Sequence, residues 1–426
     1  MTAPVVTAPV LREEEAMVEQ AAARNGDRGL DAKIARLSAR RRDGHALDQC
    51  FYADPDVFRR DVERIFLGHW LCVGHASRAA QPGDYFLFEV AGESVIIVRG
   101  RDRELRALVN VCRHRGSHVC YEASGHAKVF VCPYHAWAYE LDGALRSARH
   151  MPADFDRSGH GLKKIHLRVV EGLIFINFAD EPIGFGDAEK VVRASAGPYG
   201  WGTARLAHRE VYEIAANWKL AVENYVECYH CAPAHPEYAK LHANEQPREK
   251  TIEVNAEMRE RTAKLGIDIP EIDHWTTLAP AGEEGALCMR SAMRDGKVSG
   301  SDNGGPVAPL MGDFKDYDAG VTFFHVGVSS YFLAYPDHGL MYRFIPKTTQ
   351  TSAMEVTWLV RGDAREGVDY DFDRLTWLWK VTSEADKTII EHNQQGIDSR
   401  FYTPGPYSPM ESAASRLVEW YLAEIA

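Results

Sequence analysis

Short runs of apolar residues, some of them alternating with polar ones, recur in two separate parts of the chain, a pattern typical of β-strands. The first part holds four such runs, separated by glycines and charged residues, at 85–90, 94–99, 105–110 and 173–178. A Gln-Pro-Gly-Asp turn at 81–84 precedes them. We therefore predict a small antiparallel β domain over residues 47–180.

The second part is mixed and predicts a larger α+β domain over residues 181–426. Residues 208–232 are predicted to form a strand and then a helix, and helices follow at 371–395 and 409–425. Four further strands are predicted at 321–328, 331–335, 340–345 and 354–360, with a hairpin turn at 336–339. The stretch 245–320 is polar and rich in Gly and Pro, so we expect loops and short helices at a pocket entrance there.

The N-terminal residues 1–46 are polar with mixed charge, and 13–42 have helical character. We interpret them as a surface extension or a subunit-contact arm without chemistry of its own. A helix is predicted from Pro55 to about Phe66, because Asp54 is a suitable N-cap and proline is favoured at the first helical position.

The charge and the composition narrow the function. The chain has 426 residues and a formal charge of −12, which argues against nucleic acid or an anionic membrane as partner. It contains no run of 18 apolar residues that would predict a membrane span, and its first residues lack the pattern of a secretory signal. Eight scattered cysteines fit a reducing cytoplasm, where we expect the protein to work.

Two Cys/His pairs lie on loops that we expect at the tip of the first domain. Cys112 and His114 are separated by one residue, and Cys132 and His135 by two, with 17 residues between the pairs. Two thiolates and two imidazoles are the ligands of a Rieske [2Fe–2S] cluster, in which two histidines replace two cysteines on one iron. The turn formers around both pairs, Arg115-Gly116 and Pro133, suit loops that bend sharply over a cluster.

Two other interpretations of these four residues are weaker. A structural zinc site usually has C-x₂₋₄-C and H-x₃₋₅-H pairs, and the mixed C-x-H and C-x₂-H spacing differs from that pattern. A simple disulfide between Cys112 and Cys132 conflicts with the expected reducing compartment.

A second group of metal-ligand types lies in 217–235. On one helix Glu223, Glu227 and His230 would share a face, since they are spaced i, i+4, i+7. Pro233 is predicted to end that helix, and the chain then turns back so that His235 can reach the metal of His230. Two histidines suit Fe(II), but a catalytic site needs a carboxylate as third ligand with open positions for O₂ and substrate.

The same stretch also allows less specific interpretations. A lone pair of histidines is more often half-buried structure than a metal site. The pair Cys228 and Cys231 has the spacing of a C-x₂-C half-site, but it lies off the predicted His230 face. We interpret these two cysteines as helix packing.

Together the two motifs resemble those of the large (α) subunits of Rieske non-haem iron oxygenases. The resemblance covers about 45–420. The second motif matches the family at Asn217, Trp218, Lys219, Glu223, Asn224, His230 and His235. A further family pattern, an acid followed by Glu, Gln and Gly, matches Asp386, Glu391, Gln394 and Gly396. The resemblance implies Asp386 as the third iron ligand, with Glu384 as the nearest rival.

The resemblance also implies how electrons move. In the family the cluster of one subunit serves the iron of its neighbour in an α₃ ring, through an acidic residue three positions before the first histidine ligand. That position is Glu227, and Asn224 is the other catalytic candidate. Because the chain has no G-x-G-x-x-G dinucleotide motif, electrons are expected from a separate NAD(P)H-dependent reductase or ferredoxin.

The bridging residue is commonly Asp in the family, whereas here it is Glu227. A Glu-Cys-Tyr-His segment resembles the branch that acts on quaternary ammonium compounds, such as carnitine monooxygenase and the demethylases of glycine betaine and stachydrine. We therefore expect a monooxygenase that hydroxylates or N-demethylates a small betaine-like compound.

An aromatic cage would suit a quaternary ammonium substrate, because ring faces stabilise a cation that cannot donate hydrogen bonds. Trp275, Phe323, Phe324 and Tyr331 are candidates, although aromatic residues in strands more often belong to the core. Two alternatives stay open: a Rieske oxygenase that hydroxylates or O-demethylates an aromatic acid, and a Rieske electron-transfer protein without O₂ chemistry.

Overall fold

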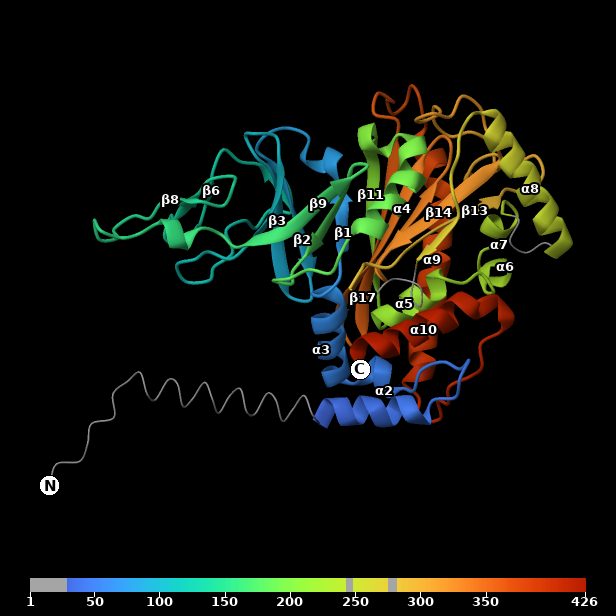
Figure 1. Ribbon diagram of the computed structural model, residues 1–426, viewed down its shortest axis with the longest axis horizontal. Helices are drawn as coiled ribbons and strands as arrows, with labels where there is room; N and C mark the ends of the chain where they lie inside the picture. The colour runs from blue at the N-terminus through green and yellow to red at the C-terminus, as the bar shows by residue number, and fades with distance from the viewer. Residues whose placement is uncertain (1–28, 243–247, 275–281) are drawn as a thin grey trace.

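The computed structural model describes residues 29–242, 248–274 and 282–426. They form two sheet-based parts that lie side by side (Figure 1). The first is a seven-stranded antiparallel sheet in the order β1-β10-β9-β4-β3-β2-β5. Its strands are β1 Leu71–His75, β2 Asp84–Val90, β3 Glu93–Arg99, β4 Leu105–Val109, β5 Ser124–His126, β9 Lys164–Val170 and β10 Leu173–Asn177. The four strands predicted in this region are β2, β3, β4 and β10, so their prediction is confirmed.

A small three-stranded sheet extends from the first part. It consists of β6 Phe130–Val131, β7 Ala138–Tyr139 and β8 Leu145–Ser147. In Figure 1 the β6 and β8 strands project at the end of the molecule farthest from the second sheet. The predicted cluster loops lie at this tip, because Cys132 follows β6 and the stretch 112–118 faces the same small sheet through Tyr139.

The second part is a seven-stranded antiparallel sheet in the order β11-β17-β16-β15-β14-β13-β12. Its strands are β11 Arg205–Ile214, β12 Ile272–His274, β13 Ala286–Ala292, β14 Gly320–Val326, β15 Ser330–Ala334, β16 Gly339–Thr348 and β17 Thr351–Val360. The predicted α+β class is confirmed, and β14 to β17 are the four predicted strands. The predicted turn at 336–339 joins β15 to β16, with the Tyr335 N–H donating to His338 O at 2.9 Å.

Helices cover both faces of the second sheet (Figure 1). Helix α4, Gly186–Ala196, packs on β13 and β14, while α5, Trp218–Tyr225, and α9, Phe372–Ile397, pack on β16, β17 and β11. Adjacent residues of one strand point to opposite faces of the sheet, because side chains alternate along a strand. Phe332 packs with Trp201 on the α4 side, and Tyr331 packs with Tyr225 on the α5 side.

The N-terminal region packs against the end of the chain. Residues 29–40 are helical, while 1–28 lie outside the described residues. Helix α3, Pro55–Asp61, begins at the predicted cap, where Asp54 accepts hydrogen bonds from the N–H groups of Asp56 and Val57. It is preceded by α2, Cys50–Ala53, and continues as a π-helix over Val62–Phe66. Helix α10, Ser412–Ile425, is joined to this region by the Arg41–Glu419 ion pair.

Two predictions in the second part are wrong. The region 245–320 contains a long helix, α8 Arg248–Lys264, and strand β13. Helix α8 was missed because it carries polar residues on nearly every side. The helix predicted through His230 ends at Tyr225, and two single turns follow, α6 Cys231–Ala234 and α7 Pro236–Ala239. Short 3₁₀ helices complete the chain at Ala76–Ala79, Ser158–His160, Gly197–Tyr199, Trp201–Thr203 and Pro409–Glu411.

Among the described residues, no helix combines the length and the apolar character needed to cross a membrane.

Candidate metal centres and substrate cavity

The two Cys/His pairs lie on two loops with the same backbone pattern. The Cys112 N–H donates to Ser117 O at 2.8 Å, and the Gly116 N–H donates to Cys112 O at 3.0 Å. On the other loop the Cys132 N–H donates to Trp137 O at 2.8 Å, and Ala136 N–H donates to Cys132 O at 2.9 Å. Gly116 and Ala136 hold equivalent positions, and both have a left-handed φ, of 76° and 57°. Each loop therefore presents its Cys and its His on the same side of a tight turn.

The four candidate cluster ligands meet between these loops. The Nδ1 atoms of His114 and His135 face each other at 3.1 Å. Cys112 and Cys132 are buried beneath them, and Tyr139 Oη lies 3.2 Å from Cys112 Sγ. The His114 ring stacks on Trp137, with the ring planes only 9° apart, which holds the imidazole in place. Two buried thiols under two exposed imidazoles match the donor set of a Rieske cluster.

The segment that carries the second motif is fastened by its own polar residues. Asn217 caps α5 by accepting the Lys219 N–H, and its side chain donates to Tyr52 O at 2.8 Å and Thr349 O at 3.0 Å. Lys219 forms a buried ion pair with Asp61. The Asn217-Trp218-Lys219 stretch thus fixes the start of α5 against the α2–α3 region and the turn between β16 and β17.

Helix α9 is fastened to the same place by two residues of the acidic pattern. Gln394 Oε1 accepts the Asn217 N–H at 2.8 Å, and Glu391 Oε1 accepts the Ala215 N–H at 3.0 Å. Because Asp386 lies two turns earlier on α9, these bonds set the position of its carboxylate relative to the histidines that follow α5.

The three predicted iron ligands come together. Asp386 Oδ1 lies 3.1 Å from His235 Nε2 and 3.3 Å from His230 Nε2. Two imidazole nitrogens and a carboxylate oxygen that converge on one point fit a 2-His-1-carboxylate iron site. Burial alone would raise the pKa of Asp386, but the two imidazoles outweigh burial and hold that pKa below its usual value. The rival Glu384 is exposed on the same helix.

Glu227 and Asn224 both contact His230. Glu227 Oε1 lies 2.5 Å from His230 Nδ1, and Asn224 Nδ2 lies 3.4 Å from His230 Nε2. The carboxylate of Glu227 therefore orients the ring so that Nε2 faces Asp386, as carboxylates beside metal-bound histidines do. Glu227 also accepts the N–H of Tyr229. This local bond supports the turn that replaces the predicted helix, where Pro233 would remove a helical hydrogen bond.

The prediction of helix packing for Cys228 and Cys231 is wrong. The two cysteines form a disulfide that spans His230. Cys231 also lies near both iron-ligand candidates, since donor atoms of His230, Cys231 and His235 are within 4.8 Å of one another. The helix assumed from sequence would have held these cysteines on its side, whereas the chain is bent here and brings them together.

A cavity of about 280 Å³ opens beside the three iron-ligand candidates. Its apolar wall is formed by Tyr225, Tyr331 and Tyr342. The ring centroid of Tyr225 lies 4.7 Å from that of Tyr331 and 5.0 Å from that of Tyr342. The cavity is also bordered by Phe323, Met289, Trp379, Met410, Ala413 and Arg416. A cavity of this size holds a small organic molecule.

The four aromatic residues predicted for the cavity have different outcomes. Phe323 and Tyr331 border it and lie on the α5 side of the sheet. Phe324 also borders it, but its ring stacks on Phe332 and packs near Trp201 in the core on the opposite face. Trp275 lies outside the described residues. Tyr225, next to Asn224 in the second motif, was missed, because its neighbours in β15 and β16 are known only from the fold.

Glu223 does not contact His230, although both were predicted to share a helix face. Its carboxylate accepts hydrogen bonds from Tyr52 Oη at 2.9 Å and Tyr407 Oη at 3.1 Å. It borders a second cavity of about 410 Å³ that also touches Glu227 and His230. Burial raises the pKa of Glu223 to about 7, against the hydrogen bonds from the two tyrosines, which lower it.

Two family models match the chain. Residues 69–166 match the Rieske [2Fe–2S] domain, and residues 202–426 match the ring hydroxylating alpha subunit (catalytic domain). The first match contains all four cluster-ligand candidates, and the second contains His230, His235 and Asp386.

The chain is similar to curated oxygenase subunits of two monooxygenases. The chain is 35% identical to the glycine betaine monooxygenase oxygenase subunit of Chromohalobacter salexigens, over 98% of this chain and 95% of that protein. It is 42% identical to the carnitine monooxygenase oxygenase subunit of Escherichia coli strain K12, over 44% of this chain and 52% of that protein.

Solved structures agree in fold. The quaternary ammonium Rieske monooxygenase CntA, in complex with an inhibitor, superimposes with a TM-score of 0.67 at 27% identity, covering 88% of this chain and 95% of that one. Naphthalene 1,2-dioxygenase from Rhodococcus sp. superimposes with a TM-score of 0.59 at 18% identity, covering 89% of this chain and 94% of that one, and shows the shared fold alone. With its Rieske domain, its catalytic domain and this fold, the chain belongs to the Rieske-type ring-hydroxylating α-subunit family of oxygen-using oxidoreductases.

Proposed function

We propose that this protein is the oxygenase component of a Rieske monooxygenase that hydroxylates or N-demethylates a small quaternary ammonium compound. The observation that carries the proposal is the cavity in which tyrosine rings stand beside the converging His230, His235 and Asp386 side chains. A quaternary ammonium group cannot donate hydrogen bonds, so aromatic faces and nearby carboxylates are the groups that can attract it.

The ligand roles are part of the proposal. Cys112, His114, Cys132 and His135 would hold a [2Fe–2S] cluster, and His230, His235 and Asp386 would hold Fe(II). When bound, the cluster supplies single electrons and the iron activates O₂. The Glu227 carboxylate contacts His230 Nδ1, where it can accept or release a proton as the charge of the centre changes. Asn224 positions the His230 ring from the other side.

The net reaction fixes what the partners must deliver. Hydroxylation of one N-methyl group consumes O₂, two electrons and two protons, and yields water and a hemiaminal that loses formaldehyde. The electrons would come from a separate NAD(P)H-dependent reductase or ferredoxin. The proposal rests in part on the relatives, which are oxygenase subunits of glycine betaine and carnitine monooxygenases, and on CntA structures with L-carnitine and γ-butyrobetaine bound.

We propose a homotrimer in which the cluster of one subunit serves the iron of the next. A CntA structure is described with inter-subunit electron transfer, and Glu227 here borders both cavities beside His230. The division into an extension over 1–46, a Rieske domain over 47–180 and a catalytic domain over 181–426 belongs to this proposal. So does a cytoplasmic location, in which Cys112 and Cys132 stay reduced although Cys228 and Cys231 form a disulfide. Light scattering after size exclusion measures the subunit number directly.

A substrate screen tests the function. The iron-loaded protein is combined with a reductase and NADH and offered betaines, carnitine-like compounds and aromatic acids, and formaldehyde or oxidised product is measured. We expect turnover of a compound with an N-trimethyl group. Turnover of benzoate-type acids without any betaine would favour the ring-hydroxylating alternative.

Metal analysis tests the class of chemistry. About three irons per two sulfides are expected if one mononuclear iron accompanies each Rieske cluster. Two irons per two sulfides would favour an electron-transfer protein instead.

A further inference from the structure

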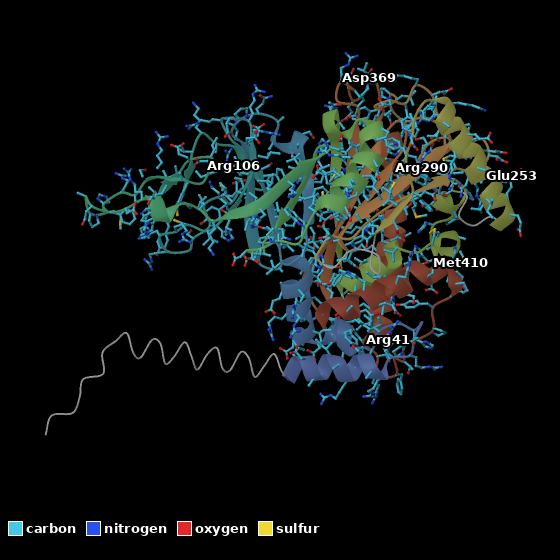
Figure 2. All side chains as sticks on the ribbon, in the orientation of Figure 1. Arg41, Arg106, Glu253, Arg290, Asp369 and Met410 are labelled. Carbon is cyan, nitrogen blue, oxygen red and sulfur yellow. A yellow bond between two sulfur atoms is a disulfide. The ribbon has the colours of Figure 1, made fainter. Side chains whose placement is uncertain are left out.

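The residues that border the substrate cavity differ in how much of each is exposed to solvent. The inner end is buried, since His235 and Trp379 are each 2% exposed and Tyr331 is 4% exposed. The outer end is formed by Met289 and Met410, which are 47% and 49% exposed, and by Arg416, which is also exposed. Met410 lies beside α10, where Figure 2 labels it. The cavity therefore has a buried end at the iron-ligand candidates and an open end at α10.

The difference between the buried and the open end orients a substrate. The group that is oxidised must lie beside the metal, so an N-methyl group has to occupy the buried end. The rings of Tyr225 and Tyr331 border the same cavity and offer faces that attract a cation. Whatever group the substrate carries opposite its ammonium head is consequently directed to the open end.

Arg416 is the one arginine or lysine among the described residues that border the cavity. Arg416 and Ala413 are three positions apart on α10, so they share one side of the helix, and both border the cavity. A guanidinium group presents a planar fork of donors that matches a carboxylate with two parallel hydrogen bonds. The open end thus offers a cationic fork to an anion, while the tyrosine rings offer their faces to a cation.

We infer that Arg416 selects substrates that carry a carboxylate opposite the quaternary ammonium group, that is, zwitterionic betaines over cationic alcohols such as choline. This inference rests on the proposed function and names the substrate class within it. A zwitterion matches both ends of the cavity. A purely cationic compound matches only the buried end and is repelled by the guanidinium group at the open end.

Kinetics of matched substrates test this role. Wild type, Arg416→Gln and Arg416→Lys are each compared on γ-butyrobetaine, glycine betaine and choline, which share the trimethylammonium head. In Arg416→Gln we expect the KM for the better betaine to rise about tenfold, the value for loss of one charge-assisted hydrogen bond at an exposed site. The kcat is expected to stay within about twofold, since Arg416 stands away from the buried end. The KM for choline should stay unchanged or fall.

Arg416→Lys should recover part of the betaine KM, because it keeps the charge without the planar fork. Arg400→Gln is the matched control, since Arg400 is exposed and does not border the cavity. A second measurement needs no turnover. Trp379 borders the cavity, so its fluorescence can follow betaine binding to the iron-loaded protein without reductase. The dissociation constant should rise by the same factor as KM.

The outcomes separate the two proposals. If wild type oxidises a betaine and Arg416→Gln leaves the betaine KM and dissociation constant unchanged, the role of Arg416 is overturned while the proposed function stands. An equal rise for choline and betaine would also overturn it, since a carboxylate contact cannot affect choline. If wild type oxidises neither betaines nor choline, the proposed function itself is removed.

Discussion

The four candidate cluster ligands lie within a stretch of 24 residues, whereas His235 and Asp386, which face each other across the candidate iron site, are 151 residues apart. The first site consists of two similar turns, each closed by its own backbone hydrogen bonds. The second needs α9 to be fastened to the start of α5 through Gln394 and Asn217. A short-range site thus depends on loop geometry, while a long-range site depends on the packing that supports it.

The largest effect is expected from removing one ligand from either site. Asp386→Ala should abolish mononuclear iron and turnover, because the two remaining imidazoles lack the carboxylate that completes the site. The cluster should stay intact, so iron should fall from about three to about two per two sulfides while the visible spectrum is preserved. Cys132→Ser is the reciprocal variant. It removes a candidate cluster ligand, so it should lose the cluster rather than the mononuclear iron. Full iron occupancy in Asp386→Ala would refute the ligand assignment.

A smaller effect is expected from loosening the support of the iron site. Gln394→Ala removes the acceptor of the buried Asn217 N–H, and such a loss costs about 1–3 kcal/mol in unfolding free energy. We expect lower mononuclear iron occupancy with an unchanged cluster, measured by metal analysis and urea unfolding. Gln395→Ala, at an exposed neighbouring position, is the control. Equal loss at both metal centres would show that the two sites are not independent.

The smallest effect concerns Glu223, which lies between the two tyrosines near the iron site. Its folded-state pKa of about 7 exceeds its usual value of 4.5, because burial disfavours the carboxylate. The protonated acid is favoured in the folded state, so its stabilising contribution is complete below pH 4.5 and is lost as the pH rises through 7. Since the carboxyl borders a cavity, we expect a loss of about 1–2 kcal/mol.

Glu223→Gln should remove this dependence. The variant should gain stability relative to wild type between pH 5 and pH 8, measured by urea unfolding at both values. Its iron and sulfide contents should not change, because Glu223 contacts neither centre. A parallel pH dependence in both proteins would argue against a raised pKa at this residue.

Local patterns identified much of the fold. Short β-rich or alternating runs located β2, β3, β4, β10 and the four central strands of the second sheet, and the residues around Asp54 located a helix start. These features are decided by neighbouring residues, either through the alternation of side chains or through capping of free N–H groups. Helix α8 escaped because its polar surface lacks the apolar stripe on which such predictions depend.

The segment 223–235 shows where local reasoning fails. Helical spacing placed Glu223, Glu227 and His230 on one face. The helix, however, ends at Tyr225, and the Glu223 carboxylate accepts hydrogen bonds from tyrosines of two other regions. Cys228 and Cys231 then meet as a disulfide. The ligand types could be recognised from the sequence, while the backbone path between them could not.

The sequence by itself determined which side chains could hold metal and, at 112–135, how they are grouped, because short loops bring nearby residues together whatever the rest of the chain does. Only the tertiary structure decided that tyrosines from α5, β15 and β16 form one wall and that Arg416 lies at the open end of the cavity. The physical reason is that these neighbours are joined by packing between distant elements, and no spacing along the chain records that packing.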